Sequence, residues 1–463
     1  MMHLWLLWWD IITTLKPAFS YVQTYRWFLS CVAGMMIRSD NTGVTSLIRA
    51  LGLKGNYYDR MLDSFHSKAV DRDLLAQLWT QTVIRLGLCH ALQGRLLLIG
   101  DGIKVPKEGK KMPAVKSLHQ ESGSNSKPQF IMGHSCQALA LCCEIKQCFF
   151  ALPLTVRIHE GIVLSNRDRR TLMDKMAALI TRLALSQPFY FLADAYYASG
   201  KIVKALLEQG NHLITRVRSN AVAYFPTPLP QERKPGRPKK YGKKVNLKSL
   251  FTTRDAFRPR RISAGTLIQY RSCDLLWRPA GQLVRFLLII HPVHGRTIYM
   301  TTDVSLAPER VIDVYALRFK IEITFRQAIH TVGTFAYHFW MKDMTPIPRG
   351  SKNQHLHKET PEYREAIARK MDAYHLHLQT GVIAQGILQY IAAVAPALVW
   401  KHFRSWIRTV RPGVLPSEAI TAKALRNTFA DFLLGFCQDE IFTKFIIEKL
   451  DEGQNNPLRL SVA

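Results

Sequence analysis

Two apolar runs in this chain each lead directly to an aspartate: LLLIGDGIKV at residues 96–105 and FYFLADAYY at residues 189–197. The apolar parts, residues 95–99 and 189–193, have the length and composition of buried strands, and they are closed by Asp101 and Asp194. The end of a strand is a place where a rigid sheet can hold a side chain beside a cleft. We therefore expect both carboxylates to line a cleft.

A third acid stands further along the chain. The run YALRFKIEITFR at residues 315–326 predicts an amphipathic helix that carries Glu322. Two carboxylates from strands and one from a facing helix form an oxygen-ligand cage suited to Mg²⁺ or Mn²⁺. These metals serve phosphodiester chemistry. The pattern predicts a metal site made by Asp101, Asp194 and Glu322, with nucleic acid as the substrate.

The charge of the chain agrees with a polyanionic partner. Its 463 residues contain 63 Lys and Arg against 34 Asp and Glu, a formal net charge of +29. Such an excess attracts phosphate backbones and anionic membranes alike. A hydrophobic content of 48% is enough to bury a sizeable core, which argues against a basic component that only coats RNA or chromatin.

Two apolar segments and the cysteines bear on the cellular compartment. Residues 3–9 lack a basic start and are followed by Asp10, so they predict a buried first helix rather than a signal peptide. Residues 381–400 contain two glutamines and a proline, which favours a core helix over a membrane span. Eight cysteines include no CxxC pair, which indicates a reducing cytoplasm. Four of them are expected to pack within strands as small apolar side chains: Cys136, Cys142, Cys143 and Cys148.

The order of predicted elements after residue 93 specifies the fold class. Three strands come first and predict an antiparallel meander, and then helix, strand, helix and strand follow. This is the order of an RNase H-like core, an α/β fold with a mixed sheet flanked by helices. In it the first strand is central and the fourth lies beside it, so Asp101 and Asp194 would be neighbours. The predicted elements are strands 95–105, 129–143 and 147–158, helix 166–185, strand 189–193, helix 200–209 and strand 212–218.

The pattern breaks after residue 218, where a Pro-rich and basic stretch predicts a loop-rich insertion between the second aspartate and the glutamate. Its tract RKPGRPKKYGKK begins at Arg233 and supplies three candidate DNA-binding residues, Arg237, Lys239 and Lys240. The tract fits a minor-groove hook and equally a basic linker that adds only counterion-driven affinity. The predicted regions are a helical domain at 1–92, the first segment of the core at 93–218, the insertion at 219–281, the second segment of the core at 282–340 and a C-terminal helical region at 341–463.

The N-terminal helical region is a candidate DNA-binding domain. Residues 42–54 and 56–65 predict two helices joined at a break at Gly55. That pattern is typical of a helix-turn-helix and also of an ordinary helical hairpin that only packs. In the first interpretation Arg60 and Lys68 would contact phosphates.

The segment around Glu322 is the most specific part of the sequence. Tyr315, Arg318 and Glu322 stand at positions i, i+3 and i+7, on one helical face. This run resembles the tyrosine, arginine, glutamate, lysine signature of DDE insertion-sequence transposases. Two other blocks resemble the aspartate blocks of that family: Asp194-Ala195-Tyr196-Tyr197, and Asp101-Gly102 followed by Lys104, Pro106, Lys107 and Gly109.

The resemblance covers about residues 96–337 and implies an activity. Members of the family cleave DNA at mobile-element ends and transfer the strands. It implies that Asp101, Asp194 and Glu322 are the catalytic ligands of two Mg²⁺ (or Mn²⁺) ions, and that Tyr315 and Arg318 contact the DNA end. The implied partners are double-stranded DNA with terminal inverted repeats and target DNA, bound by a homodimer. The implied setting is the bacterial cytoplasm, with action at the nucleoid.

One position departs from the signature, because Ile329 stands where the lysine is expected. The DNA-end contact of that lysine and a hairpin intermediate are therefore not carried over. Arg326 and His330 are the nearby candidates for DNA contact. Glu160 and Asp303 compete for the metal roles, with a turn or cap role as the alternative for each.

Two other functions fit the same residues. One is a catalytically inactive, domesticated protein that binds specific DNA sequences with the same fold. The other is an RNase H-like nuclease that cleaves without joining. The presence of all three acids favours an enzyme over the inactive protein.

Overall fold

The central strand of the protein is β2 (Arg95–Pro106), and the other core strands add to both of its edges. The computed structural model describes residues 3–120, 128–227, 239–262, 265–406, 408–437 and 439–451, apart from the side chains of Arg254 and Phe436. β4 (Phe130–Ile145) pairs antiparallel with β2, and β5 (Cys148–Ile158) pairs with the other edge of β4. On the far edge of β2, β7 (Phe189–Ala193) and then β8 (His212–Val217) run parallel to it. The order β5-β4-β2-β7-β8 confirms the expected RNase H-like core.

The side chains of β2 are buried alternately on the two faces of this sheet. Leu96 and Leu98 belong to one apolar cluster, and Leu97 and Ile99 belong to another. Because successive side chains of a strand point to opposite faces, both faces need a cover. The first cluster includes residues of α6 (Leu172–Arg182) and α7 (Gly200–Leu207), and the second includes residues of α8 (Pro308–Leu317) and α9 (Lys320–Gln327).

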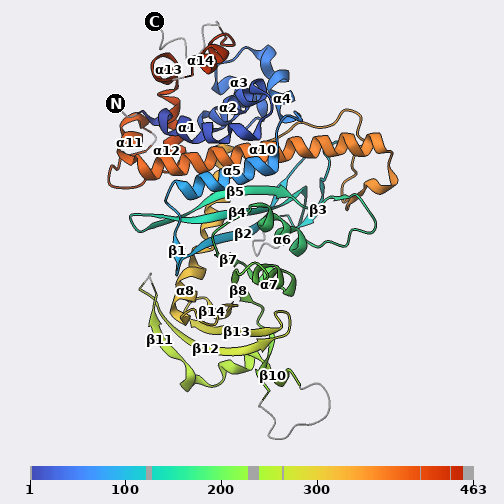
Figure 1. Ribbon diagram of the computed structural model, residues 1–463, viewed down its shortest axis with the longest axis vertical. Helices are drawn as coiled ribbons and strands as arrows, with labels where there is room; N and C mark the ends of the chain where they lie inside the picture. The colour runs from blue at the N-terminus through green and yellow to red at the C-terminus, as the bar shows by residue number, and fades with distance from the viewer. Residues whose placement is uncertain are drawn as a thin grey trace.

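Strands continue the sheet beyond β8, in the lower part of Figure 1. The order there is β14 (Gly295–Thr301), β13 (Gln282–His291), β12 (Leu267–Trp277), β9 (Val222–Pro226) and β10 (Tyr241–Asn246). The expectation of a loop-rich insertion at residues 219–281 is wrong in this respect. The many Lys, Arg and Pro residues conceal an alternating pattern in β12, where buried Ile268 and Tyr270 alternate with exposed Leu267 and Gln269.

The basic tract of the insertion is described only in its last residues. Lys239 and Lys240 are exposed directly before β10, whereas Arg237 lies outside the described residues. The DNA-binding role of the tract stays a prediction.

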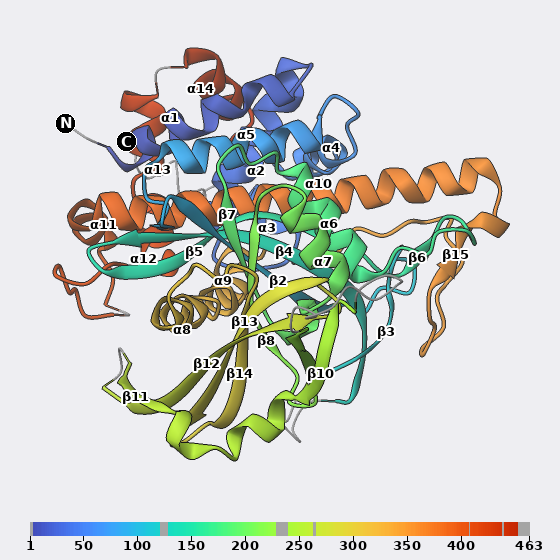
Figure 2. The ribbon, with the colours of Figure 1, turned by 60° about the horizontal axis from the view of Figure 1, so that its bottom comes forward.

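Helices from both ends of the chain cover the upper side of the sheet (Figures 1 and 2). The long α10 (Pro361–Val394) packs on β5 and also against α2 (Val22–Ile37). The predicted buried first helix is confirmed as α1 (Leu4–Ile12), and its Trp5 donates from Nε1 to the Leu425 carbonyl oxygen at 3.0 Å. The helices of this layer also include α3 (Val44–Ala50), α4 (Tyr58–Phe65), α5 (Arg72–Arg85), α11 (Pro396–Phe403), α12 (Glu418–Arg426), α13 (Phe429–Asp431) and α14 (Glu440–Ile447).

The remaining strands are short and peripheral. β1 pairs with β2, β3 with β4, β11 with β12, and β15 with β6. Their bounds are β1 (Ala91–Leu92), β3 (Lys116–His119), β6 (Ile162–Val163), β11 (Arg258–Arg261) and β15 (Gln354–His355).

The predicted helical hairpin of the N-terminal region is present as α3 and α4, with a short 3-10 turn, Gly55–Tyr57, between them. Arg60 is exposed, and the Nζ of Lys68 lies 3.7 Å from a carboxylate oxygen of Glu365 on α10. Both interpretations of this hairpin, DNA-binding and packing, remain open predictions. The boundaries of the predicted regions also stay predictions.

The apolar segment at residues 381–400 is divided between α10 and α11. In the described stretches of the chain no single helix is long and apolar enough to cross a membrane. Only α10 and α11 taken together reach that length and apolarity, and the two helices are bent by 103° relative to each other. Gln385 is buried and donates from Nε2 to the Thr324 carbonyl oxygen at 2.9 Å.

The predicted packing of the strand cysteines is confirmed for three of four. Cys136, Cys142 and Cys143 are buried in β4, and all eight cysteines are free thiols. Cys148 is exposed, because it starts β5 directly after the left-handed turn at Lys146 and Gln147.

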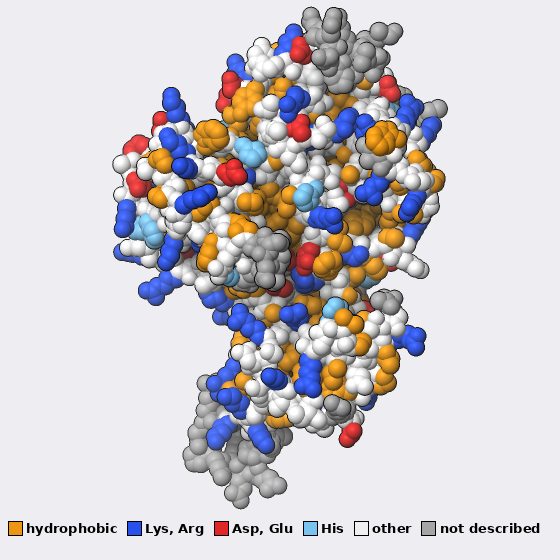
Figure 3. Space-filling view, turned by 180° about the vertical axis from the view of Figure 1, so that it is seen from behind, with side chains coloured by type: hydrophobic (Ala, Val, Ile, Leu, Met, Phe, Trp, Pro, Cys, Tyr) orange, Lys and Arg blue, Asp and Glu red, His pale blue; other side chains and the backbone are white. Residues whose placement is uncertain are grey.

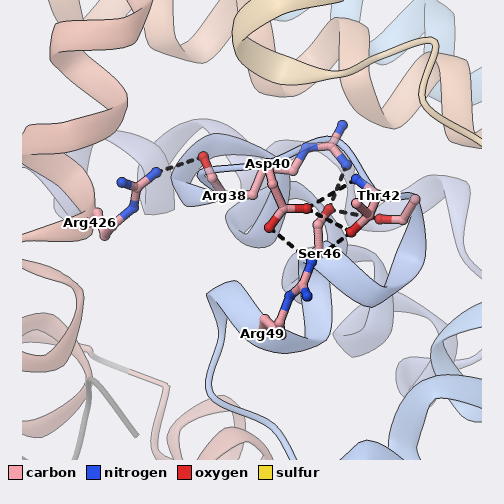
Figure 4. Close-up of polar contacts among 7 residues, drawn as sticks. Arg38, Asp40, Thr42, Ser46, Arg49 and Arg426 are labelled. Atoms are coloured by element: carbon pink, nitrogen blue, oxygen red, sulfur yellow. Dashed lines mark hydrogen bonds and ion pairs between the residues drawn. The ribbon is translucent and has the colours of Figure 1, made fainter. Parts of the chain in front are cut away.

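A buried arginine joins the N-terminal helices to the helix that carries Glu322. Arg38, at the end of α2, donates from Nε to the Val332 carbonyl oxygen at 2.7 Å and from Nη1 to Ser46 Oγ at 3.1 Å. Val332 ends the π-helical turn η6 (Ala328–Val332) that follows α9. Figure 4 shows Arg38 with Ser46 and with Arg426 of α12, which donates to the Arg38 carbonyl oxygen at 2.6 Å. Arg38 thus supplies hydrogen-bond donors to the end of η6, where a carbonyl group has no partner within its own helix.

Replacing Gly333 with alanine should destabilise this junction. Gly333 has φ +66°, and a Cβ there would overlap the guanidinium of Arg38. The left-handed conformation and the overlap together should lower the free energy of unfolding by about 2 kcal/mol or more. Chemical denaturation measures this loss.

Gly210 is the matched control, because it follows α7 with φ +71° and a Cβ there meets no atom within 4 Å. Gly210→Ala should lose only about 1 kcal/mol, from the backbone strain. Equal losses in the two variants would contradict the role given to Arg38.

Candidate active site

Asp101 and Asp194 lie side by side on neighbouring parallel strands. The pairing of β2 with β7 ends at Ile99 and Leu192, and each aspartate follows its strand partner by two residues. The sequence suggested that Asp101 closes its strand. The structure differs, because β2 continues to Pro106 through its pairing with β4. β7 ends first, since Asp194 caps a 3-10 turn by accepting the Tyr196 N–H at 3.0 Å. Because β7 ends while β2 continues, the edge of β2 that pairs with β7 is no longer paired with it at Asp101.

The third acid comes from a helix that is broken where one continuous helix was expected. α8 ends at Leu317 and α9 begins at Lys320. The link is a tighter turn, in which the N–H of Arg318 bonds the Tyr315 carbonyl oxygen and the N–H of Glu322 bonds the Phe319 carbonyl oxygen, each at 3.1 Å. Phe319 points outward, 54% exposed, while Arg318 at the break is largely buried.

Arg318 links the strand acid to the helix acid. Its Nη1 lies 3.1 Å from Asp101 Oδ2, and its Nη2 lies 2.7 Å from Glu322 Oε1. The side chains of Arg318 and Asp101 are 17% and 18% exposed, whereas Glu322 is 42% exposed. The guanidinium therefore acts as an internal counter-ion for two of the three predicted ligands.

The carboxylates are crowded enough to disfavour full ionisation. Burial, and then the Asp194 and Glu322 carboxylates, raise the pKa of Asp101 to about 6, although the Gly102 N–H and Arg318 act to lower it. Burial likewise raises the pKa of Asp194. A divalent cation relieves this kind of repulsion.

The donor set matches a hard cation in chemistry, although the ligands are not closed around one. Carboxylate oxygens are the ligands that Mg²⁺ and Mn²⁺ prefer. Among the described residues, no three His, Cys, Asp or Glu side chains are arranged as a metal-binding cluster. Arg318 is bonded to Asp101 and Glu322 instead, so metal binding requires that it shift from at least one of them.

A basic groove of about 770 Å³ adjoins the acids, between β8, β14, the turn Leu247–Phe251 and α8. Its lining contains aromatic rings and no carboxylate. Figure 3 shows the same excess of charge on one whole face, where Lys and Arg side chains are widespread and acidic ones are few. The cations that line the groove are Arg216, Arg218, Lys248, Arg296 and Arg318. A concave surface of one sign concentrates anionic ligands.

The predicted DNA-contact residues divide into two groups. Tyr315 and Arg318 both line the groove, and the Tyr315 ring packs on Tyr299 with their centroids 4.3 Å apart. Arg326 on α9 and His330 in η6 are exposed and lie outside the groove lining. Their DNA contacts stay predictions, as does the site as a whole.

Four groove cations were not singled out from the sequence. Arg216 and Arg218 stand two residues apart at the end of a predicted strand, so an alternating pattern could have put them on one face. Lys248 and Arg296 come from separate segments of the extended sheet and meet the others only through tertiary structure. Overall charge alone could not select them.

The competing acids have other partners. Glu160 accepts a hydrogen bond from Lys116 Nζ at 3.2 Å. Asp303 accepts from the Tyr190 hydroxyl at 2.7 Å and from the Ser305 N–H at 2.9 Å, which is the turn role anticipated for it. These contacts hold both carboxylates in structural roles.

The chain is similar to known proteins in its sequence and in its structure. Residues 14–266 match the sequence model of the family described as "DDE superfamily endonuclease", more than half of the chain. No curated protein matches the chain. A solved structure titled as the piggyBac transposase synaptic complex with hairpin DNA is similar at 10% identity, with a TM-score of 0.40, over 94% of this chain and 78% of that chain.

Proposed function

Because the chain belongs to the DDE superfamily endonuclease family, we propose that it is a DNA transposase that cleaves mobile-element ends and transfers the freed strands. The observation that carries this proposal is the arrangement of the three acids. Asp101 and Asp194 are adjacent on parallel strands, Arg318 links Asp101 to Glu322, and a carboxylate-free groove of cations begins at Arg318.

Endonucleases of this family generally use divalent metal ions, and Asp101, Asp194 and Glu322 are the residues that would hold Mg²⁺ or Mn²⁺ here. When bound, two such ions supply an activated water or 3′-hydroxyl and stabilise the leaving oxygen. The groove cations pair with the phosphates on either side of the scissile bond and fix the DNA strand along the sheet. Arg318 exchanges a carboxylate for a phosphate oxygen, which a bidentate guanidinium recognises well.

The partners proposed are double-stranded DNA with terminal inverted repeats and a target DNA. A homodimer would hold two ends at once. Each subunit presents one set of acids and one groove, so paired ends require two copies.

A strand-transfer assay on DNA that carries the sequences flanking the gene tests this function. Nicking and joining in Mg²⁺ or Mn²⁺, with neither reaction in EDTA, is the expected result. Cleavage without joining would support a nuclease instead. Specific binding without nicking in any divalent metal would support an inactive DNA-binding protein.

The groove makes a separate prediction about affinity. Arg216→Ala combined with Arg218→Ala removes two cations from the groove. If each contacts a phosphate, the slope of log affinity against log salt should fall by about 2, with a loss of about 10- to 100-fold at moderate salt. Fluorescence anisotropy with a labelled DNA end, in Ca²⁺, measures both quantities.

The matched control removes the same charge elsewhere. Arg408 and Arg411 are exposed in the segment between α11 and α12. Their double alanine variant should change affinity by less than about threefold, since distant exposed charges are screened by salt. An equal effect of the two double variants would mean that net charge, rather than the groove, binds the DNA.

A further inference from the structure

Two cysteines that are far apart in the sequence face each other in the core. Cys89 lies between α5 and β1, and Cys143 lies near the end of β4. The two residues are paired in an antiparallel β-bridge. Cys143 is buried in the same apolar cluster as Leu96 and Leu98, and Cys89 packs against that cluster while staying partly exposed. Neither cysteine has a role in the function proposed above.

The backbone hydrogen bonds of this bridge determine how closely the two side chains approach. These bonds join the flanking residues: the His90 N–H donates to the Cys142 carbonyl oxygen at 2.9 Å, and the Glu144 N–H donates to the Leu88 carbonyl oxygen at 2.8 Å. The two cysteines are therefore a non-hydrogen-bonded pair of an antiparallel ladder, in which the Cα atoms are about 4.5 Å apart and the side chains are closest. A disulfide spans Cα separations of about 4.4 to 6.8 Å, so this pair has the spacing that a disulfide needs.

The two thiols differ in their readiness to ionise. A hydrogen bond between the thiols lowers the pKa of Cys89 and raises the pKa of Cys143, and burial raises the pKa of Cys143 further. The thiolate is the form of cysteine that oxidants attack. The partly exposed Cys89 is therefore the first sulfur to react, and the buried Cys143 is its partner.

The other cysteines near this pair are placed differently. Cys142 is next to Cys143 on β4, but it belongs to the apolar cluster on the opposite face of the sheet. Cys148 begins β5, where it is exposed and pairs with Ile145. The placement on one face and on one bridge thus distinguishes Cys89 and Cys143 from both of them.

We propose that Cys89 and Cys143 are a redox-active dithiol, which hydrogen peroxide converts to a reversible disulfide. The Cys89 thiolate attacks one oxygen of the peroxide, the O–O bond breaks, and the departing hydroxide takes up a proton to form water. The Cys143 thiol then attacks the sulfur of the Cys89 sulfenic acid, which forms the S–S bond and releases a second water. Two thiols lose two electrons in total, and one peroxide gains them.

The disulfide would close a loop that contains β2, β3 and most of β4. Such a loop limits the freedom of the unfolded chain, so the oxidised protein should be the more stable form. Cys143 is five residues along β4 from Ala138, which lies opposite Asp101. At about 3.4 Å per residue the cross-link is about 17 Å from the strand position of that acid, so it does not depend on the chemistry proposed there.

The test uses the full-length protein with Cys148→Ser, which removes an exposed thiol that could link two molecules. After treatment with hydrogen peroxide and alkylation of the remaining thiols, tryptic digestion should give peptides 86–95 and 117–146 joined to each other. Dithiothreitol should separate them. The oxidised protein should unfold about 5 °C above the reduced protein.

Single serine variants identify the sulfur atoms, because peptide 117–146 contains three cysteines. Cys89→Ser and Cys143→Ser should each abolish the cross-link and the gain in thermal stability. Cys89 is partly exposed, so its variant tests the pair with little disturbance of the core. Cys142→Ser is the matched control, since it changes a buried cysteine of the same strand and the same peptide. It should form the cross-link as readily as the parent protein.

The inference is overturned by a cross-link that persists in Cys143→Ser, by its loss in Cys142→Ser, or by a parent protein whose Cys89 is oxidised to sulfinic acid without any link. A cross-linked protein with no gain in thermal stability over its reduced form would contradict the stabilising role of the disulfide. These measurements need neither DNA nor a divalent metal, so failure of the proposed function would leave their outcome unchanged.

Discussion

Asp194→Ala should abolish metal-dependent cleavage of DNA ends while DNA affinity stays unchanged. The carboxylate is expected to hold a metal ion, and its loss should slow cleavage on the order of a thousandfold or more. It carries no positive charge, so no phosphate contact is removed with it. Cleavage rates in Mg²⁺ and affinity in Ca²⁺, measured on the same DNA, separate the two effects.

Glu160→Gln is the matched control. Glu160 also follows a strand of the core, but its carboxylate accepts from Lys116. This variant should cleave at close to the wild-type rate. Loss of DNA binding in Asp194→Ala, or loss of cleavage in Glu160→Gln, would count against the assignment of the acids.

Asp101→Asn should also lose cleavage, and it should make the metal-free protein more stable at neutral pH. The pKa of Asp101 is raised from 3.8 to about 6, first by burial and then by the other two acids. A shift of about two units corresponds to about 3 kcal/mol of unfavourable energy in the ionised form. Asparagine has nearly the same shape and no charge to bury.

The direction of the pKa shift of Asp101 determines the pH range in which Asp101→Asn gains stability. Because the folded pKa is the higher one, the proton stabilises the folded state below about pH 4, and this contribution disappears as the pH rises through 6. The gain in Asp101→Asn should therefore be near zero below pH 4 and reach about 3 kcal/mol above pH 6. Denaturation in EDTA at several pH values measures it.

Asp303→Asn should behave in the opposite way. Burial alone would raise the pKa of Asp303, but hydrogen bonds from Ser305 and Tyr190 hold it below its ordinary value. The ionised form is stabilising there, so the variant should lose stability above pH 4. An Asp101→Asn protein that is less stable than wild type at pH 7 would contradict the crowding described for the acids.

Much of the core was predictable because its signals are local. Apolar runs that end in acids gave β2 and β7, and the order of elements placed Asp101 beside Asp194. The match of residues 14–266 to the DDE superfamily endonuclease family agrees with the resemblance of the sequence motifs to DDE transposases. These patterns depend on neighbouring residues, which is why one sequence was enough.

The rest depends on contacts between distant residues. The strands at residues 222–277 were concealed by Lys, Arg and Pro, because their pairing and not their composition makes them strands. The helical spacing of Arg318 and Glu322 predicts that these two side chains pair. It could not predict the bond of Arg318 to Asp101, which is distant in sequence. The ring of His159 bonds Gln137 on the neighbouring strand, a contact that no local pattern indicates.

Diffraction from crystals of the protein with a DNA end and Mn²⁺, measured at the manganese absorption edge, tests whether the three acids bind the metal. Anomalous density is expected among Asp101, Asp194 and Glu322, with the Arg318 guanidinium shifted from a carboxylate toward a phosphate. Manganese bound at other residues, with Arg318 still between Asp101 and Glu322 while the DNA end lies in place, would contradict it.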